Sequence, residues 1–287
     1  MPSTSSNVCY VPKWQNPLLQ SMRRIILLLL CLCLLPLSVK SSDSTAVSRN
    51  IRHARWYSHG EQIWRHVDIY VPRGYEADTL PVLYLIHGIN GHEGAWQERG
   101  SAVDTLQALI DAGRCAPMLL VMPDCNLWPT EERPLTRGRR WKCVWRYAEL
   151  SHEHTLEYAV SDLMDMVDTV YHTSWCAVAG LSDGARISAN IARVRPDRIQ
   201  AVGMFSPVVS RQQLPPDSLL AGCPDMPCID YRVYVGRTDM FRPNGQRFHR
   251  RMERRQLPHS YTILPGRHDW PVWRVCLARF LEETAAR

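Results

Sequence analysis

One serine between two glycines has surroundings that suggest chemistry. Ser182 lies in Gly180-Leu-Ser-Asp-Gly184, after the apolar run 176–179 and before an expected helix over 185–193. A strand, a tight turn and a helix are the setting in which Gly-x-Ser-x-Gly forms a nucleophile elbow. The small flanking residues permit the sharp turn, which exposes the Ser182 hydroxyl. An ordinary serine in a glycine-punctuated turn is the alternative, so its expected partners matter.

A serine hydroxyl is a weak nucleophile and needs a base, usually a histidine that a carboxylate orients. When these groups follow one another as Ser, acid and His, the base lies downstream of Ser182. Only three histidines do so. His249 falls in an expected basic helix, and His259 precedes a strand, at the wrong edge of the sheet. His268 follows the last expected strand at the correct edge and is the predicted base; a surface loop histidine is the alternative.

The predicted acid is Asp239, which follows the penultimate expected strand at the same edge. Asp230 precedes that strand and would lie at its opposite end. Asp225 belongs to the preceding loop, and Asp269 adjoins His268 too closely to turn back onto its ring. An aspartate that only caps a turn is the alternative for Asp239.

Two backbone N–H groups are expected to form an oxyanion hole. One belongs to Asp183, the residue after the nucleophile, where a helix start aims N–H groups at the reacting centre. The other is assigned to Ile89, in the glycine-rich loop over 87–96. A simple strand-to-loop turn at His87-Gly88 is the alternative.

The elements that must position these residues alternate along the chain. The run 81–86 is almost continuously apolar, as in strands buried on both faces. Alternation from there onward predicts an α/β protein, with a doubly wound, mostly parallel sheet preceded by an antiparallel hairpin. With the Gly-x-Ser-x-Gly turn and the order Ser, acid, His, this arrangement is that of the α/β-hydrolase fold. Such sheets bind ligands beyond the carboxyl ends of their strands. The expected strands are 53–58, 63–71, 81–86, 118–122, 176–179, 201–205, 231–235 and 261–264, and the expected helices are 102–112, 154–170, 185–193, 245–255 and 272–283.

The N-terminal residues are typical of a targeting segment. Residues 22–41 combine Met22-Arg-Arg24, the apolar run 25–37 and small or polar residues, which predicts a secretory signal peptide. The run is short for a membrane span, and an uncleaved anchor is the alternative. Residues 1–21 are interpreted as an upstream extension, 42–50 as a linker and 51–287 as the folded domain. We therefore expect a secreted or periplasmic protein with no membrane span after cleavage.

Charge and cysteine content narrow the possible partners. Residues 1–41 hold four basic and no acidic residues, so 34 − 4 = 30 basic residues face 28 acidic ones beyond them. Because basic and acidic residues nearly balance, the net charge gives no reason to expect nucleic-acid binding. Seven cysteines remain after residue 41, an odd number, and Cys223 and Cys228 are close enough to form a disulfide. No metal site is expected, because His152-Glu-His154 belongs to an expected helix start.

The segment 125–149 has no periodicity and combines tryptophans with arginines. Aromatic side chains this dense are costly to leave in water, so we expect a lid-like insertion over the site; a solvated basic loop is the alternative. The predicted substrate-binding residues are Trp128, Trp141, Trp145 and Trp270.

Four motifs resemble the putative esterase family of α/β-hydrolases: His87-Gly-Ile, Gly180-Leu-Ser-Asp-Gly184, Gly236-x-x-Asp239 and Gly266-Arg-His-Asp-Trp-Pro-Val-Trp273. The family includes feruloyl and acetyl-xylan esterases, S-formylglutathione hydrolase, enterochelin esterases and mycolyl transferases. The resemblance covers residues 51–285. It implies a triad of Ser182, Asp239 and His268, with the N–H groups of Ile89 and Asp183 as the oxyanion hole. Asp183 departs from the Met of many relatives, and its charge disfavours anionic acyl groups.

These features together predict an exported serine carboxylesterase that needs no cofactor. The expected substrate is an ester on a small molecule or polysaccharide, with a feruloyl or acetyl group on a carbohydrate favoured. Export argues against S-formylglutathione, a cytosolic substrate. An acyltransferase that uses the same triad is one alternative, and a catalytically silent binding protein on a hydrolase scaffold is another.

Overall fold

The computed structural model describes residues 51–126, 153–209 and 229–285. Several predictions fall outside these ranges: the extension 1–21, the signal peptide 22–41, the linker 42–50 and the Cys223–Cys228 pair. Trp128, Trp141 and Trp145 also lie outside the described residues, with most of the predicted lid. Within the described ranges, no helix has both the length and the apolar content that a membrane crossing requires.

Eight strands form one sheet in the order β1-β2-β4-β3-β5-β6-β7-β8. The pairs β1–β2 and β2–β4 are antiparallel, and every pair from β4 to β8 is parallel. This confirms the predicted fold class, including the antiparallel N-terminal hairpin. The strands are β1 Ile51–Ser58, β2 Ile63–Tyr70, β3 Leu80–Ile86, β4 Leu119–Pro123, β5 Thr173–Leu181, β6 Ile199–Phe205, β7 Asp230–Gly236 and β8 His259–Leu264.

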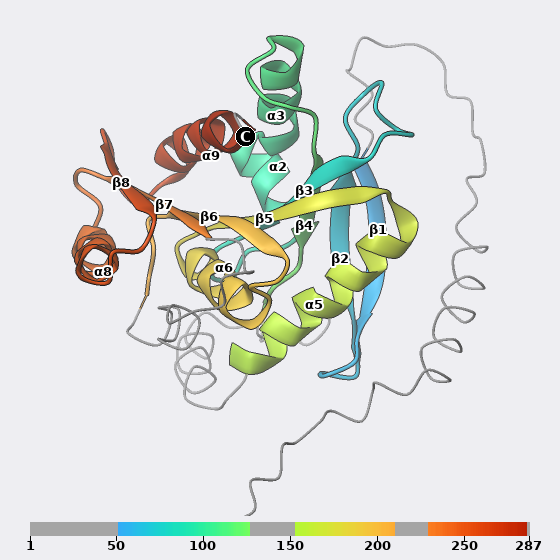
Figure 1. Cartoon of the computed structure of the whole chain (residues 1–287), viewed down its shortest axis with the longest axis horizontal. Coiled ribbons are helices and arrows are strands. Elements are labelled where there is room, and N and C mark those ends of the chain that lie inside the picture. Colours follow the sequence, from blue (N-terminus) through green and yellow to red (C-terminus); the bar gives the residue numbers. More distant parts are fainter. Residues whose placement is uncertain (1–50, 127–152, 210–228, 286–287) are drawn as a thin grey trace, which may run out of the picture. The chain divides into compact units, whose positions relative to one another are not determined.

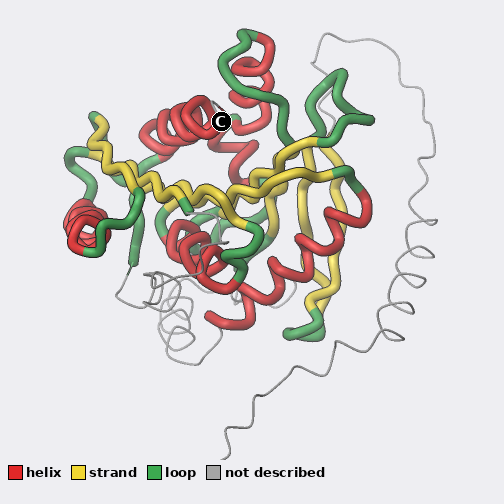
Figure 2. The backbone as a smooth tube through the Cα atoms, viewed as in Figure 1, coloured by secondary structure: helices red, strands yellow, loops and turns green. Residues whose placement is uncertain are grey.

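Helices cover both faces of this sheet (Figure 1). One apolar core lies under α5, α6 and α8, and a second lies under α2, α3 and α9. Figure 2 shows the sheet as a layer between these two groups of helices. The described helices are α2 Ala95–Gly100, α3 Ala102–Asp111, α5 Glu153–Val170, α6 Asp183–Val194, α8 Arg242–Arg254 and α9 Trp270–Ala285.

The sequence did not predict α2: its first two residues were assigned to the glycine-rich loop over 87–96, and 97–100 were assigned to no element. Trp96 is fully buried, and its indole N–H donates to the Ile86 carbonyl at 2.9 Å. That contact fixes a short helix directly after a segment rich in glycine, which does not favour helix. The helix α8 also begins earlier than expected, with Pro243 in its first turn, where a missing N–H costs nothing.

Candidate active site

Ser182 lies in the turn between β5 and α6, in a conformation that non-glycine residues rarely adopt. Its φ is 54° and its ψ is −113°. Such a backbone costs on the order of 1–3 kcal/mol and persists only where the surroundings impose it. Here the Ser182 N–H donates to the Phe205 carbonyl of β6 at 2.8 Å. The neighbouring strand therefore holds the strained serine in place.

The two glycines of the motif allow the turn to close. A Cβ on Gly180 would lie 2.4 Å from the carbonyl carbon of Gly184. A Cβ on Gly184 would lie 2.3 Å from the carbonyl oxygen of His87, which follows β3. Any side chain at either position would push the start of α6 away from the sheet.

The structure brings Ser182, His268 and Asp239 into one hydrogen-bonded line. The Ser182 hydroxyl donates to His268 Nε2 at 3.0 Å. The His268 Nδ1–H donates to the Asp239 carboxylate, with N···O distances of 3.1 and 3.0 Å. Asp239 follows β7 and His268 follows β8, so three strand ends supply the three side chains.

Asp239 is buried, and its charge is nevertheless favoured. Burial raises the pKa of this carboxyl, but hydrogen bonds from the His268 ring, the Ser206 hydroxyl and the Phe241 N–H outweigh it, so the pKa is lowered. The Phe241 N–H lies 2.7 Å from Oδ1. Asp239 is therefore an anion at neutral pH, the form that holds His268 in the tautomer with its proton on Nδ1.

Two further residues, to which the sequence assigned no role, contact Asp239 and His268. Ser206 follows β6, and its hydroxyl accepts a hydrogen bond from the Trp273 indole N–H at 3.0 Å while it donates to Asp239. The Trp273 ring also packs edge-on against the His268 ring, with centroids 5.0 Å apart. Asp239, His268, Trp273 and Ser206 thus form a closed ring of contacts. The signal for Ser206 was present in the sequence, since it too follows a strand at the carboxyl edge.

The predicted oxyanion-hole residues lie on two adjacent segments. Asp183 is the first residue of α6, where a backbone N–H has no acceptor within the helix. Ile89 lies in a turn that the Gly91 N–H closes onto the Gly88 carbonyl at 3.0 Å. A Cβ on Gly88 would lie 3.6 Å from Ser182 Cβ, so this turn lies against the nucleophile. Among the described residues, the Ile89 N–H has no hydrogen-bond acceptor.

Buried polar contacts hold the segment that carries Ile89. His87 Nε2 accepts from the Cys125 N–H at 2.9 Å, and its Nδ1 lies 2.7 Å from the Gly88 carbonyl oxygen, to which it donates. The Asn126 amide donates to the Gly91 carbonyl at 2.6 Å. Burial raises the pKa of the Cys125 thiol far above its usual range, so this cysteine is no rival nucleophile.

Asp183 does not present an uncompensated charge beside Ser182. The Arg186 guanidinium donates to its carboxylate at 2.7 Å, one turn further along α6. The expected bias against anionic acyl groups is therefore weaker than the sequence alone indicated, because the pair is neutral as a unit.

Trp270, the one predicted substrate-binding residue within the described ranges, is half-buried in a packing cluster. Its ring meets the rings of Trp96 and Trp273 edge-on, at 5.2 and 5.3 Å between centroids. The Arg99 guanidinium lies over it at 5.1 Å. These contacts join α2 to α9, and the substrate contact of Trp270 stays a prediction.

The described residues offer no group of three His, Cys, Asp or Glu side chains that could hold a metal ion. The cysteines in these ranges are free thiols: Cys115, Cys125, Cys176 and Cys276.

Comparison with known proteins gives a family and a fold. A family model described as "Putative esterase" matches residues 61–227. Among curated proteins, the chain is similar to an endo-1,4-beta-xylanase/feruloyl esterase from Xylanibacter ruminicola, with 23% identity over 245 residues. That match covers 81% of this chain and 31% of the relative, so the chain spans about a third of that protein's length.

Solved structures show the same fold at low sequence identity. A ferulic acid esterase from Anaeromyces mucronatus superposes with a TM-score of 0.65 and 20% identity, over 86% of this chain and 95% of that one. An S-formylglutathione hydrolase from Staphylococcus aureus gives a TM-score of 0.65 and 15% identity, over 87% and 100%. An enterobactin esterase from Shigella flexneri gives 0.61 and 20%, over 83% and 59%.

Proposed function

The chain belongs to the putative esterase family, and from that premise we propose that it is a serine carboxylesterase with Ser182, His268 and Asp239 as its triad. Ser182 Oγ attacks the ester carbonyl carbon while His268 Nε2 takes the hydroxyl proton. His268 then gives that proton to the leaving alcohol, and a water molecule hydrolyses the acyl-enzyme by the same route. Asp239 orients His268 and stabilises its protonated form.

The observation that supports this proposal best is the unbroken line of hydrogen bonds from Ser182 to Asp239. Its N···O distances at His268 are 3.0 Å toward the nucleophile and 3.0 to 3.1 Å toward the acid. The heavy atoms of a base and of the group that gives it a proton must lie within about 2.6–3.2 Å of each other, and this geometry meets that requirement. The position beyond the carboxyl ends of parallel strands agrees with where such sheets bind ligands.

The oxyanion that forms on the attacked carbonyl needs donors that are already in place. We assign this role to the N–H groups of Asp183 and Ile89, which approach Ser182 from α6 and from the segment after β3. Removing one such donor typically costs about 10²–10³ in kcat. Neither donor is a side chain, so the contacts that fix the backbone around Ile89 serve the same step.

The substrate that we favour is an ester carried by a carbohydrate, with a feruloyl or acetyl acyl group. The names of the similar proteins support this choice, since they include a xylanase/feruloyl esterase and a ferulic acid esterase. The sequence of residues 22–41 supports export to the periplasm or the exterior, where polysaccharides are available.

The first test is hydrolysis of p-nitrophenyl acetate and methyl ferulate by the full chain and by Ser182→Ala. We expect the variant to lose at least about 10³-fold in kcat while it stays folded, because the residual rate then comes from binding and the oxyanion donors alone. Two histidine variants extend this test. His268→Ala should lose activity, whereas its matched control His249→Ala, in α8, should keep it. Equal rates in wild type and Ser182→Ala would contradict the proposal.

A further inference from the structure

The β1–β2 hairpin extends past the edge of the sheet. In β2, Val67 pairs with Pro123, the last residue of β4. Residues 63–66 therefore continue beyond the end of β4 and lead into the turn after Ser58. At about 3.4 Å per residue, Trp64 stands roughly 10 Å beyond Val67. We call residues 55–66 the hairpin arm.

The edge that the arm passes is the edge that carries the triad. Ile86 of β3 pairs with Gly180 of β5, and Ser182 follows two residues later. The strands β2 and β5 are separated by β4 and β3. Three strand spacings of about 4.8 Å put the arm roughly 14 Å to one side of the nucleophile. A short oligosaccharide spans that distance.

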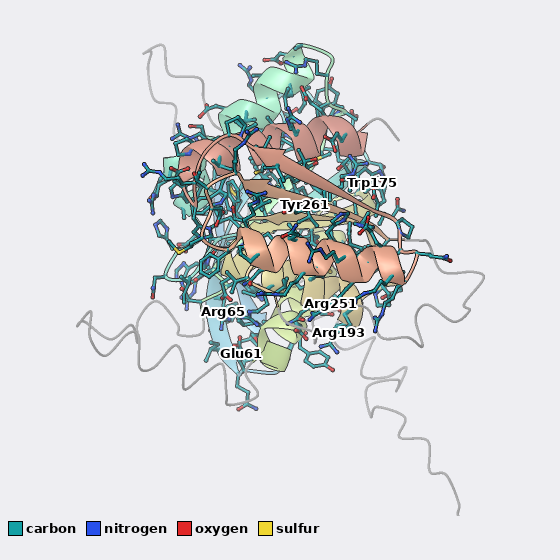
Figure 3. All side chains as sticks on the ribbon, turned by 90° about the vertical axis from the view of Figure 1, so that its left-hand side faces the viewer. Glu61, Arg65, Trp175, Arg193, Arg251 and Tyr261 are labelled. Carbon is teal, nitrogen blue, oxygen red and sulfur yellow. The ribbon has the colours of Figure 1, made fainter. Side chains whose placement is uncertain are left out.

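The arm is held rigidly by one buried arginine. Arg65 is 2% exposed, and its guanidinium donates to both carboxylate oxygens of Glu61 at 2.5 and 2.6 Å. Figure 3 shows these two side chains together on the hairpin. A further N–H group of Arg65 donates to the carbonyls of Asp124 and Asn126, at 3.1 and 2.9 Å. The arm is thereby fixed to the segment that also supports the turn around Ile89.

The two faces of the arm differ in character. Trp56 is buried on one face, where its indole N–H donates to the Ala159 carbonyl of α5 at 2.9 Å. On the other face, Tyr57 and Trp64 are direct cross-strand partners, with ring centroids 5.4 Å apart. Trp64 remains 46% exposed, and the Arg55 guanidinium lies over its ring at 5.6 Å.

An aromatic pair beside an arginine, on the water-facing side of a rigid arm, is suited to a sugar chain. Aromatic rings pack on the C–H faces of sugars, and the guanidinium offers donors to hydroxyl or carboxylate oxygens. Tyr57 and Trp64 contact each other, so they form one aromatic patch with Arg55 beside it, and contiguous exposed apolar patches rimmed by polar groups mark interaction sites.

We propose that the exposed face of the hairpin arm, with Tyr57, Trp64 and Arg55, is a distal subsite for the sugar chain of a polysaccharide whose ester group reaches Ser182. The inference rests on the proposed function, because it presumes ester cleavage at Ser182. It adds that the protein acts on a polymer and holds it at a second place, away from the bond that breaks.

Binding without turnover tests the subsite directly. The full chain carrying Ser182→Ala is titrated with soluble arabinoxylan from which the esters have been removed, and the same is done with Ser182→Ala/Trp64→Ala. We expect the Kd to rise about twofold to tenfold on loss of the Trp64 ring. The matched control is Tyr158→Ala, an exposed aromatic on α5, which should leave the Kd unchanged. An unchanged Kd in the Trp64 variant, or an equal rise in the control, would overturn the proposal.

Kinetics separate this inference from the proposed function. For wild type and Trp64→Ala, kcat/KM is measured on feruloylated arabinoxylan and on methyl ferulate. We expect the ratio of polymer to small-ester kcat/KM to fall about twofold to tenfold in the variant. If neither ester is cleaved by the wild type, the proposed function fails; if both are cleaved and the ratio is constant, only the subsite fails. Trp64→Thr, which places a β-branched residue of high strand propensity at this position, repeats the test where Trp64→Ala does not fold.

Discussion

The two sides of the site meet at Ser182 but are held by different kinds of contact. On the side of β6, β7 and β8, the contacts join side chains to one another. His268 and Ser206 donate hydrogen bonds to the Asp239 carboxylate, and Trp273 donates to Ser206. On the side of β2, β3 and β4, side chains hold backbone: Asn126 reaches a carbonyl of the turn that carries Ile89.

This difference follows from the chemistry assigned to each side. Proton transfer needs a side chain with a titratable nitrogen and a charge that orients it. Oxyanion binding needs N–H groups at fixed positions, and the backbone supplies them. A change on the first side should therefore alter charge and pH dependence, whereas one on the second should alter position alone.

The largest effect should come from removing the charge on the first side while keeping its shape. Asp239→Asn places an amide beside His268 and favours the tautomer with its proton on Nε2, which cannot accept from Ser182. We expect kcat on p-nitrophenyl acetate to fall about 10⁴-fold at neutral pH. A loss of less than tenfold, in a protein that unfolds in urea at the wild-type midpoint, would remove Asp239 from the triad.

A second change acts where the two sides touch. Gly184→Ala would put a methyl group 2.3 Å from the His87 carbonyl oxygen, and the start of α6 would have to move. We expect the free energy of unfolding to fall by about 2–3 kcal/mol, with loss of activity on both esters. Urea unfolding followed by fluorescence measures the first, and initial rates measure the second.

The control for that change is Gly245→Ala in α8. A Cβ added at Gly245 would lie 3.5 Å from its nearest neighbour, an ordinary van der Waals distance. Alanine also has a higher helix propensity than glycine. Stability should therefore hold or rise slightly. If both glycine variants behaved alike, the close approach at Gly184 would not be what shapes the elbow.

On the second side, Asn126→Ala removes the support of the Gly91 carbonyl and a hydrogen bond to the Asp124 carboxylate, and it leaves Asp239 and His268 untouched. We expect kcat to fall about tenfold through misplacement of the Ile89 N–H, with KM for methyl ferulate nearly unchanged. The pH dependence of kcat/KM should keep its shape. A shift of that profile would show that Asn126 acts on the proton-transfer side instead.

The smallest effect should come from Ser206→Ala, and it should depend on pH. The folded-state pKa of Asp239 is lowered, so its ionised form stabilises the fold above its unfolded pKa of about 3.9. That contribution is lost as the pH falls through the folded-state pKa. Without the Ser206 hydrogen bond the folded-state pKa rises, so we expect about 1 kcal/mol less stability at pH 7. The difference should shrink once the pH is below the folded-state pKa, where only the lost Trp273 hydrogen bond remains.

Ser260→Ala provides the comparison for this variant. The Ser260 hydroxyl, on β8, is buried and has no hydrogen-bond partner among the described residues. Urea unfolding at several pH values should find it close to wild type throughout. A difference between Ser206→Ala and wild type that stays constant with pH would mean that the serine does not act through Asp239.

The sequence predicted the residues whose place depends on strand ends. A parallel sheet gathers the carboxyl ends of its strands at one edge, so Ser182, Asp239 and His268 could be brought together without knowing any side-chain contact. Ser206 satisfied the same rule but was passed over, because a serine followed by proline carries no motif. Its role depends on an indole from α9, which only the packed fold supplies.

The residues on the other side were harder to predict. Arg65 occupies a strand position where a charge would normally face water, and its burial depends on Glu61 and on two carbonyls beyond β4. Asp183 was expected to disfavour anionic acyl groups, and Arg186 at helical spacing was not considered. That i,i+3 ion pair could have been predicted from the sequence, because residues three apart lie next to each other on a helix surface.

The position of Trp273 has a consequence for the protein's synthesis. Ser182 leaves the ribosome long before His268 and the helix α9 that carries Trp273, and its strained turn is held by β6, which also comes later. A nascent chain that stops short of His268 contains Ser182 but neither the proposed base nor the Trp273 indole that closes the contacts around Asp239. The proposed triad and the contacts around it are therefore complete only once the last described helix has been made.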